Sequence, residues 1–109
     1  MKRGGIYRIK RPTKQDPKRF RAYIIVSRQA LIETVYDTLI CAPIYTNPNG
    51  LPTEVYVGID DGLKRESCIR CDELISIHRS KLTDFIGSLS PQKMPELDQA
   101  LKVALEIEN

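Results

Sequence analysis

No tryptophan, one histidine and only three cysteines occur among the 109 residues of this chain. Cys41, Cys68 and Cys71 are an odd set without a disulfide framework, which is typical of proteins from a reducing compartment. No run of about 18 apolar residues is present, so no transmembrane helix or membrane partner is expected. The basic first residues are not followed by the apolar core of a signal peptide, which favours a cytoplasmic protein.

Several catalytic motifs are also missing. The sequence has no phosphate-binding loop, no dinucleotide fingerprint and no serine in a nucleophile elbow. Cys68 and Cys71 form a Cys-x-x-Cys, but residues i and i+3 of an extended strand face opposite sides, whereas a zinc knuckle needs a turn. We therefore interpret these thiols as buried. His78 has no second catalytic group near it in the sequence, so a serine or metal hydrolase is disfavoured and no metal or cofactor is expected.

Acidic residues are scarce in the first quarter of the chain. Up to Arg28 there are ten lysines and arginines against a single acid, Asp16, which gives a net charge of +9. The remaining residues carry seven basic and thirteen acidic side chains, a net charge of −6, so the whole chain has +3. This asymmetry predicts an anionic partner, most simply a nucleic-acid backbone, with a solvated basic loop as the alternative.

The pattern of apolar residues predicts one mainly β domain over residues 1–109. The expected strands cover 4–11, 21–27, 36–45, 54–57 and 67–78, with a helical turn over 28–32. Residues 21–27 are apolar nearly throughout, so both faces of that strand should be buried. Pro43 predicts an edge strand or a bulge. Residues 82–86 have helical spacing, although 85–89 also suit a short strand.

A C-terminal helix is the last predicted element. Ser90 is a candidate N-cap, and Pro91 suits the first helical turn. An apolar helical stripe follows, formed by Met94, Leu97, Leu101, Ala104 and Leu105. Many short strands with one terminal helix predict a small, strongly bent β-barrel.

The predicted strand over 67–78 carries the most reactive combination of side chains. Because side chains alternate between faces, Arg70 and Asp72 should share one face, either as a plain ion pair or as a catalytic pair. Arg21 and Thr46 lie at the ends of two other predicted strands, and all four can converge at one rim of a barrel. Cleavage of an RNA phosphodiester needs only a base, here Asp72, and cations such as Arg21 and Arg70 to stabilise the phosphorane.

At these residues the chain resembles the MazF/PemK/Kid family of toxin ribonucleases. The matching stretches run in the family's order along nearly the whole chain, namely residues 3–7, 21–27, 42–44, 62–67, 70–77 and 86–90. The resemblance implies an SH3-like β-barrel that forms a homodimer. It further implies metal-independent cleavage of single-stranded mRNA to a 2′,3′-cyclic phosphate and a 5′-OH, and inhibition by a cognate antitoxin.

The resemblance also implies roles for individual residues. Arg21 matches the family's catalytic arginine, and Arg70 with Asp72 matches the Arg-x-Asp pair of the Kid branch. Either Tyr45 or Thr46 fills the position of the family's threonine or serine. The candidate RNA-binding residues are Lys14, Lys18, Arg19, Arg28 and Tyr45. The family's usual residues are replaced at Gly5, Ala22 and His78.

Two other functions remain compatible with the residues. One is a non-catalytic gyrase inhibitor like the toxin CcdB, although that family uses a tryptophan-bearing C-terminal tail and this chain has no tryptophan. The other is an inactive homologue that binds RNA without cutting it. The charge asymmetry also predicts an acidic antitoxin whose binding weakens with salt.

Overall fold

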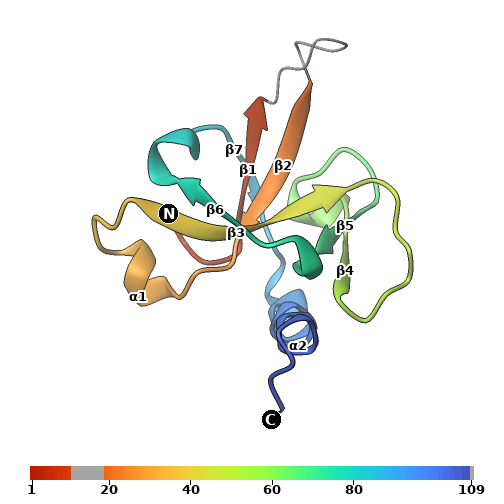
Figure 1. The fold of residues 1–109 in the computed structure, drawn as a ribbon. Helices are drawn as coiled ribbons and strands as arrows, with labels where there is room; N and C mark the ends of the chain where they lie inside the picture. Colours follow the sequence, from red (N-terminus) through yellow and green to blue (C-terminus); the bar gives the residue numbers. More distant parts are fainter. Residues whose placement is uncertain (11–18, 109) are drawn as a thin grey trace.

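A curled antiparallel sheet forms most of the molecule, which is described here from a computed structural model covering residues 1–10 and 19–108 (Figure 1). Its strands are β1 (Gly5–Lys10), β2 (Phe20–Ile25), β3 (Thr38–Tyr45), β4 (Glu54–Val57), β5 (Ser67–Arg70), β6 (Ile75–His78) and β7 (Phe85–Ser88). They are ordered β4-β5-β3-β2-β1-β7, and β6 also pairs with β3. The helices are α1 (Gln29–Ile32) and α2 (Met94–Ala104), and 3-10 turns cover Ile59–Asp61, Cys71–Glu73, Arg79–Lys81 and Pro91–Lys93. The prediction of a mainly β, strongly bent barrel-like fold with a C-terminal helix is confirmed, and the sheet curls into a half-barrel.

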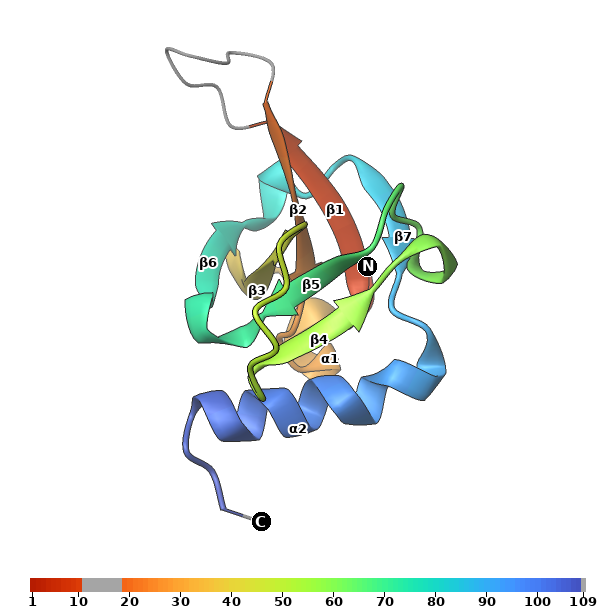
Figure 2. The same cartoon turned by 90° about the vertical axis from the view of Figure 1, so that its right-hand side faces the viewer.

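The central strands bury side chains on both faces. Ile24 of β2 belongs to one apolar cluster, while Tyr23 and Ile25 belong to the other, which confirms the burial predicted for this strand. The first cluster lies between the sheet and α2, which contributes Leu97 and Ala100. Figure 2 shows α2 running beneath β4 at the rim of the sheet. Met94, Leu97, Leu101 and Ala104 of the predicted stripe therefore pack against the core, whereas Leu105 lies beyond the end of α2 and is exposed.

The edge or bulge predicted from Pro43 is wrong, because β3 lies inside the sheet. One side of β3 pairs with β2, and Pro43 lies opposite Tyr23. Its other side pairs with β6 over residues 38–41 and with β5 over residues 44–45. Pro43 thus falls where the partner strand changes, and neither β5 nor β6 needs a hydrogen bond from it.

The single strand predicted over residues 67–78 is also wrong, because a 3-10 turn divides it into β5 and β6. Ile69 of β5 pairs with Ile44 of β3, and Ile75 of β6 pairs with Cys41 of β3. Six positions along the β5–β6 segment therefore correspond to only three positions along β3. The three extra residues leave the ladder. An odd number of extra residues also reverses the face on which later side chains lie.

At residues 82–86 the structure selects the strand alternative, since β7 covers Phe85–Ser88 and pairs with β1. Gly62 and Gly87 permit a close approach of the loop after β4 to this strand. A Cβ at Gly87 would lie 2.3 Å from the carbonyl oxygen of Asp61, and one at Gly62 would lie 2.3 Å from that of Ile86. Among the described residues, no helix is long and apolar enough to cross a membrane.

Candidate active site

A basic cleft of about 400 Å³ opens beside the start of β2 and the end of β3. Its cations are Arg8, Arg19, Arg21, Lys64 and Arg65. Tyr45, Thr46, Asn47 and Phe20 also line it, and no acidic side chain is among the described residues of its wall. Lys64 and Arg65 reach the cleft because their loop is held against β7 at Gly62. A cleft with this lining suits a polyanion.

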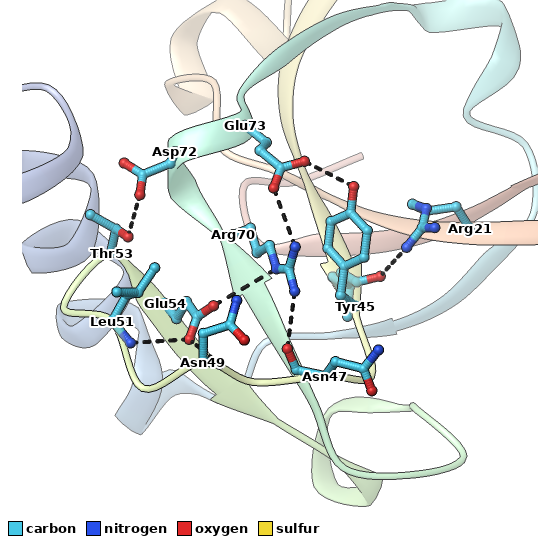
Figure 3. A network of polar contacts seen from close by, with 11 residues as sticks. Arg21, Tyr45, Asn47, Asn49, Leu51, Thr53, Glu54, Arg70, Asp72 and Glu73 are labelled. Atoms are coloured by element: carbon cyan, nitrogen blue, oxygen red, sulfur yellow. Dashed lines mark hydrogen bonds and ion pairs between the residues drawn. The ribbon is translucent and has the colours of Figure 1, made fainter.

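The sheet register arranges four side chains in a row across neighbouring strands. Ala22 lies opposite Ile44, so the next position places Arg21 opposite Tyr45. Tyr45 lies opposite Cys68, which makes Arg70 its diagonal neighbour on the same face. Arg70 in turn lies opposite Glu54. Residues distant in the sequence are thereby brought into direct contact (Figure 3).

Arg21 makes few polar contacts for a half-buried arginine. Its Nη1 donates to the carbonyl oxygen of Ile44 at 3.3 Å, and its Cζ lies 3.9 Å from the centre of the Tyr45 ring. Its Nε is buried and has no hydrogen-bond partner within the described part of the chain. No carboxylate there forms an ion pair with it, so its positive charge remains available to a ligand.

Arg70, by contrast, is surrounded by acceptors. Its guanidinium lies 3.7 Å from Glu54 and 3.4 Å from Glu73, and it donates to the carbonyl oxygen of Asn47 at 3.0 Å. Burial raises the pKa of Glu54, but hydrogen bonds from the backbone of Asn49 and Leu51, together with Arg70, hold it below its ordinary value. Glu54 therefore stays ionised and offsets the charge of Arg70, although Arg70 Nε and Glu54 Oε2 are too far apart for a hydrogen bond and have no other hydrogen-bond partner among the described residues.

Asp72 does not lie beside Arg70 in the way that the sequence predicts. It belongs to the 3-10 turn, and its Oδ2 accepts a hydrogen bond from Thr53 Oγ1 at 2.6 Å. Its side chain lines a small cavity of about 70 Å³ together with Arg70, Glu54 and Glu73. Figure 3 shows Tyr45 and Arg70 between Arg21 and Asp72. The carboxylate that contacts Arg70 from this turn is Glu73, because a turn brings residue i+3 back toward residue i.

The remaining predicted residues divide into three groups. Thr46, Tyr45 and Arg19 line the cleft, and both candidates for the threonine position therefore reach it. Arg28 is exposed just before α1, beyond the end of β2 that lies away from Arg21, and it does not line the cleft. Lys14 and Lys18 lie outside the described residues.

The cysteines are buried, as the sequence predicts. Burial raises the pKa of Cys41 to about 12 and that of Cys71 to about 11. Cys68, the third, is fully buried as well. Thiols with such pKa values carry little thiolate near neutral pH and are poor nucleophiles.

Sequence reasoning missed Arg8, Lys64 and Arg65 in the cleft wall, and Glu54 and Glu73 around Arg70. The general excess of basic residues was the only signal for Arg8. The two loop cations reach the cleft through a glycine contact that no periodicity encodes. Glu73 would have been found had residues 71–73 been interpreted as a turn.

Comparison with known proteins agrees with this architecture. The family model of PemK-like, MazF-like toxins of type II toxin–antitoxin systems matches residues 2–105. The endoribonuclease MazF3 of Mycobacterium tuberculosis is 31% identical over 88 residues, covering 81% of this chain and 84% of the relative.

Solved structures give the same result. The M. tuberculosis toxin MazF-mt6 superposes with a TM-score of 0.82 at 27% identity, covering 96% of this chain and 99% of that one. A mycobacterial endoribonuclease in complex with its cognate antitoxin has the same fold, with a TM-score of 0.82 at 23% identity over 100% of this chain and 98% of its own. This chain therefore belongs to the PemK-like, MazF-like toxins of type II toxin–antitoxin systems.

Proposed function

We propose that this toxin is a sequence-specific, metal-independent endoribonuclease that cleaves single-stranded mRNA. The observation that carries the proposal is the basic cleft, in which Arg21 has no carboxylate partner among the described residues. A cation left unpaired in a half-buried site is suited to a phosphate. The endoribonuclease name of the 31% identical relative supports the same activity.

The proposed reaction is an intramolecular transesterification. The 2′-oxygen of one ribose bonds to the adjacent phosphorus, and the bond from phosphorus to the next 5′-oxygen breaks. A base accepts the 2′-OH proton, and the leaving 5′-oxygen takes a proton from water; the hydroxide that remains takes the proton from the base, which regenerates both. The products are a 2′,3′-cyclic phosphate and a 5′-OH. Arg21 stabilises the negative charge that accumulates on the pentacoordinate phosphorus, and Thr46 donates a hydrogen bond to a phosphate oxygen.

Asp72 is the proposed base. Its side chain is exposed and has one hydrogen bond within the described part of the chain, from Thr53, whereas Glu54 and Glu73 are both paired with Arg70. Because Arg70 lies between Arg21 and Asp72, an RNA strand that reaches both passes over Arg70. Arg70 then stabilises charge and does not transfer a proton, since its ordinary pKa of about 12.5–13.8 is too high.

We further propose that residues 1–109 act as one toxin domain, as a homodimer, in the cytoplasm. Its cognate antitoxin would be an acidic peptide that covers the cleft, because a negative segment complements five cations. The solved complexes of related toxins with their antitoxins, in a mycobacterium and in Deinococcus radiodurans, support such a partner.

The experiment incubates the purified protein with mixed-sequence single-stranded RNA in EDTA and identifies the fragment ends. We expect cuts at a short recognition sequence, each leaving a cyclic phosphate and a 5′-OH. Retention of RNA without cuts would instead identify an inactive RNA-binding homologue, and arrest of gyrase without RNA cleavage would identify a CcdB-like inhibitor. Replacing Asp72 with Asn should lower the cleavage rate by about 100-fold or more, as expected for loss of a general base.

A further inference from the structure

The ring of Tyr45 lies between two guanidinium groups. The Cζ atoms of Arg21 and Arg70 are 3.9 and 4.0 Å from the ring centre, and Figure 3 shows one on either side. Both faces of the ring are therefore covered, and no RNA base can stack on it in this arrangement. Tyr45 must contribute to the site in some way other than the base stacking expected of an exposed aromatic residue.

The hydroxyl group of Tyr45 fixes the ring in this place. It donates a hydrogen bond to Glu73 Oε1 at 2.9 Å, while Arg70 Nη1 lies 3.4 Å from Glu73 Oε2. Burial, followed by the bond to Glu73, raises the pKa of Tyr45 above its ordinary value. The phenol therefore remains protonated at neutral pH and continues to donate to Glu73.

The two faces of the ring hold arginines with different surroundings. Arg70 is compensated by Glu54 and Glu73. Arg21 has only the aromatic face and one carbonyl oxygen among the described residues. An aromatic face attracts a cation without neutralising it, whereas a carboxylate offsets part of the charge. Arg8, another cation of the cleft, does have a carboxylate partner, because its Nε lies 2.9 Å from Asp84 Oδ2.

We propose that Tyr45 is a positioning residue. Its ring orients Arg21 toward the scissile phosphate without compensating the positive charge of Arg21, and Glu73 holds the ring in place through the Tyr45 hydroxyl group. The inference rests on the proposed ribonuclease activity. In this role the ring matters more than the hydroxyl group. The other cations of the cleft bind the RNA strand, so correct placement of Arg21 by Tyr45 stabilises mainly the transition state and affects kcat more than KM.

Three variants test the proposal by steady-state cleavage of a short RNA. Tyr45→Leu removes the ring and should lower kcat by about 100-fold, the usual effect of misplacing a catalytic group by an ångström, with KM nearly unchanged. Tyr45→Phe keeps the ring and should retain at least about a third of kcat, since only the Glu73 bond is lost. Tyr56→Leu removes an exposed tyrosine outside the cleft and should leave both constants unchanged.

Other results would overturn the proposal. If the leucine variant cut RNA at the wild-type rate, Tyr45 would have no positioning role. If phenylalanine lost as much kcat as leucine while the ring still shifted the Arg21 protons in NMR spectra, the hydroxyl group would be acting in the chemistry and not as an anchor. A rise in KM at constant kcat would mean that Tyr45 contacts the RNA directly.

A readout that does not depend on cleavage separates this proposal from the proposed activity. In NMR spectra, the side-chain protons of Arg21 should be shifted upfield by the ring in the wild type and in Tyr45→Phe, and this shift should vanish in Tyr45→Leu. Unshifted Arg21 protons in the wild type would refute the stacking even in an active enzyme. A wild type with the shift but without cuts would instead refute the ribonuclease activity.

Discussion

Replacing Asp61 with Asn should destabilise the fold strongly although Asp61 does not line the proposed site. The Asp61 side chain is fully buried, and it accepts hydrogen bonds from Lys93 Nζ at 2.7 Å, Ser90 N at 2.9 Å, Ser90 Oγ at 3.0 Å and Gly58 N at 3.0 Å. It joins the loop after β4 to the start of the C-terminal helical region. Asparagine has an NH2 group in place of one carboxylate oxygen. That group is itself a donor, so it would face the N–H and O–H groups of Lys93, Ser90 and Gly58 without accepting from them.

The expected cost is about 3 kcal/mol, the lower end of the range for removing one partner of a buried, hydrogen-bonded ion pair. In urea, a chain of this size has an m-value of about 1.5 kcal/mol/M, so the unfolding midpoint should fall by about 2 M. Far-UV circular dichroism can follow the transition.

The pH dependence provides a second readout. Burial alone raises the pKa of Asp61, but the hydrogen bonds from Lys93, Gly58 and Ser90 outweigh it and leave the pKa below its ordinary value. The stability that Asp61 contributes is therefore fully present above the unfolded-state pKa of about 3.9 and is lost as the pH falls through the lower folded-state pKa. The difference between wild type and Asp61→Asn should be constant from about pH 5 to 8 and shrink below about pH 4.

Two further variants keep this test decisive. Asp60→Asn makes the same charge change at an exposed neighbour and should shift the midpoint by less than about 0.3 M. Ser90→Ala removes one of the four bonds and should cost about 1 kcal/mol, which remains measurable if Asp61→Asn does not fold. Equal midpoints for Asp60→Asn and Asp61→Asn would refute the reasoning.

Three other outcomes follow from the same structure. Gly87→Ala should lower the free energy of unfolding by more than about 2 kcal/mol, because the new Cβ would lie 2.3 Å from a backbone oxygen. Gly58→Ala, whose Cβ would have its nearest neighbour at 4.0 Å, should lower it by less than about 1 kcal/mol, and urea unfolding measures both. Cys41 and Cys71 should react with a thiol reagent at pH 8 only as fast as the protein opens, and reaction at the rate of a free thiol would contradict their burial. Affinity for 2′-O-methyl RNA, which cannot be cut, should fall about 50-fold between 50 and 200 mM salt if the four cleft cations other than Arg8, which pairs with Asp84, contact phosphates. Salt-independent binding would exclude the cleft as the binding site.

The sequence was sufficient wherever local patterns decide the structure. The apolar run in β2 predicted a strand buried on both faces, and the stripe from Met94 predicted α2 with its packed side. It was insufficient where pairing between distant segments decides. The three residues that leave the ladder between β5 and β6 follow from β3 changing partners at Pro43, and no pattern within 67–78 shows this.

That local difference determines how well the candidate site was predicted. Arg21, Thr46, Arg70 and Asp72 were predicted to converge at one rim, and the register does bring Arg21 and Arg70 to the two faces of Tyr45, next to Thr46. Asp72 was assigned to the wrong surroundings because strand alternation was extended through a turn. The acidic partners of Arg70 depend on the β4–β5 pairing and on that turn, so they became visible only in three dimensions.

The most direct test of the account compares Arg21→Gln with Lys81→Gln in single-turnover cleavage of RNA in EDTA. Both variants remove one positive charge, but Lys81 is exposed and lies outside the cleft. Loss of a guanidinium that stabilises the phosphorane should slow Arg21→Gln by about 1,000-fold, as for other preorganised donors, while Lys81→Gln cuts at the wild-type rate. Equal rates for the two variants would contradict the assignment of Arg21 and, with it, the proposed active site.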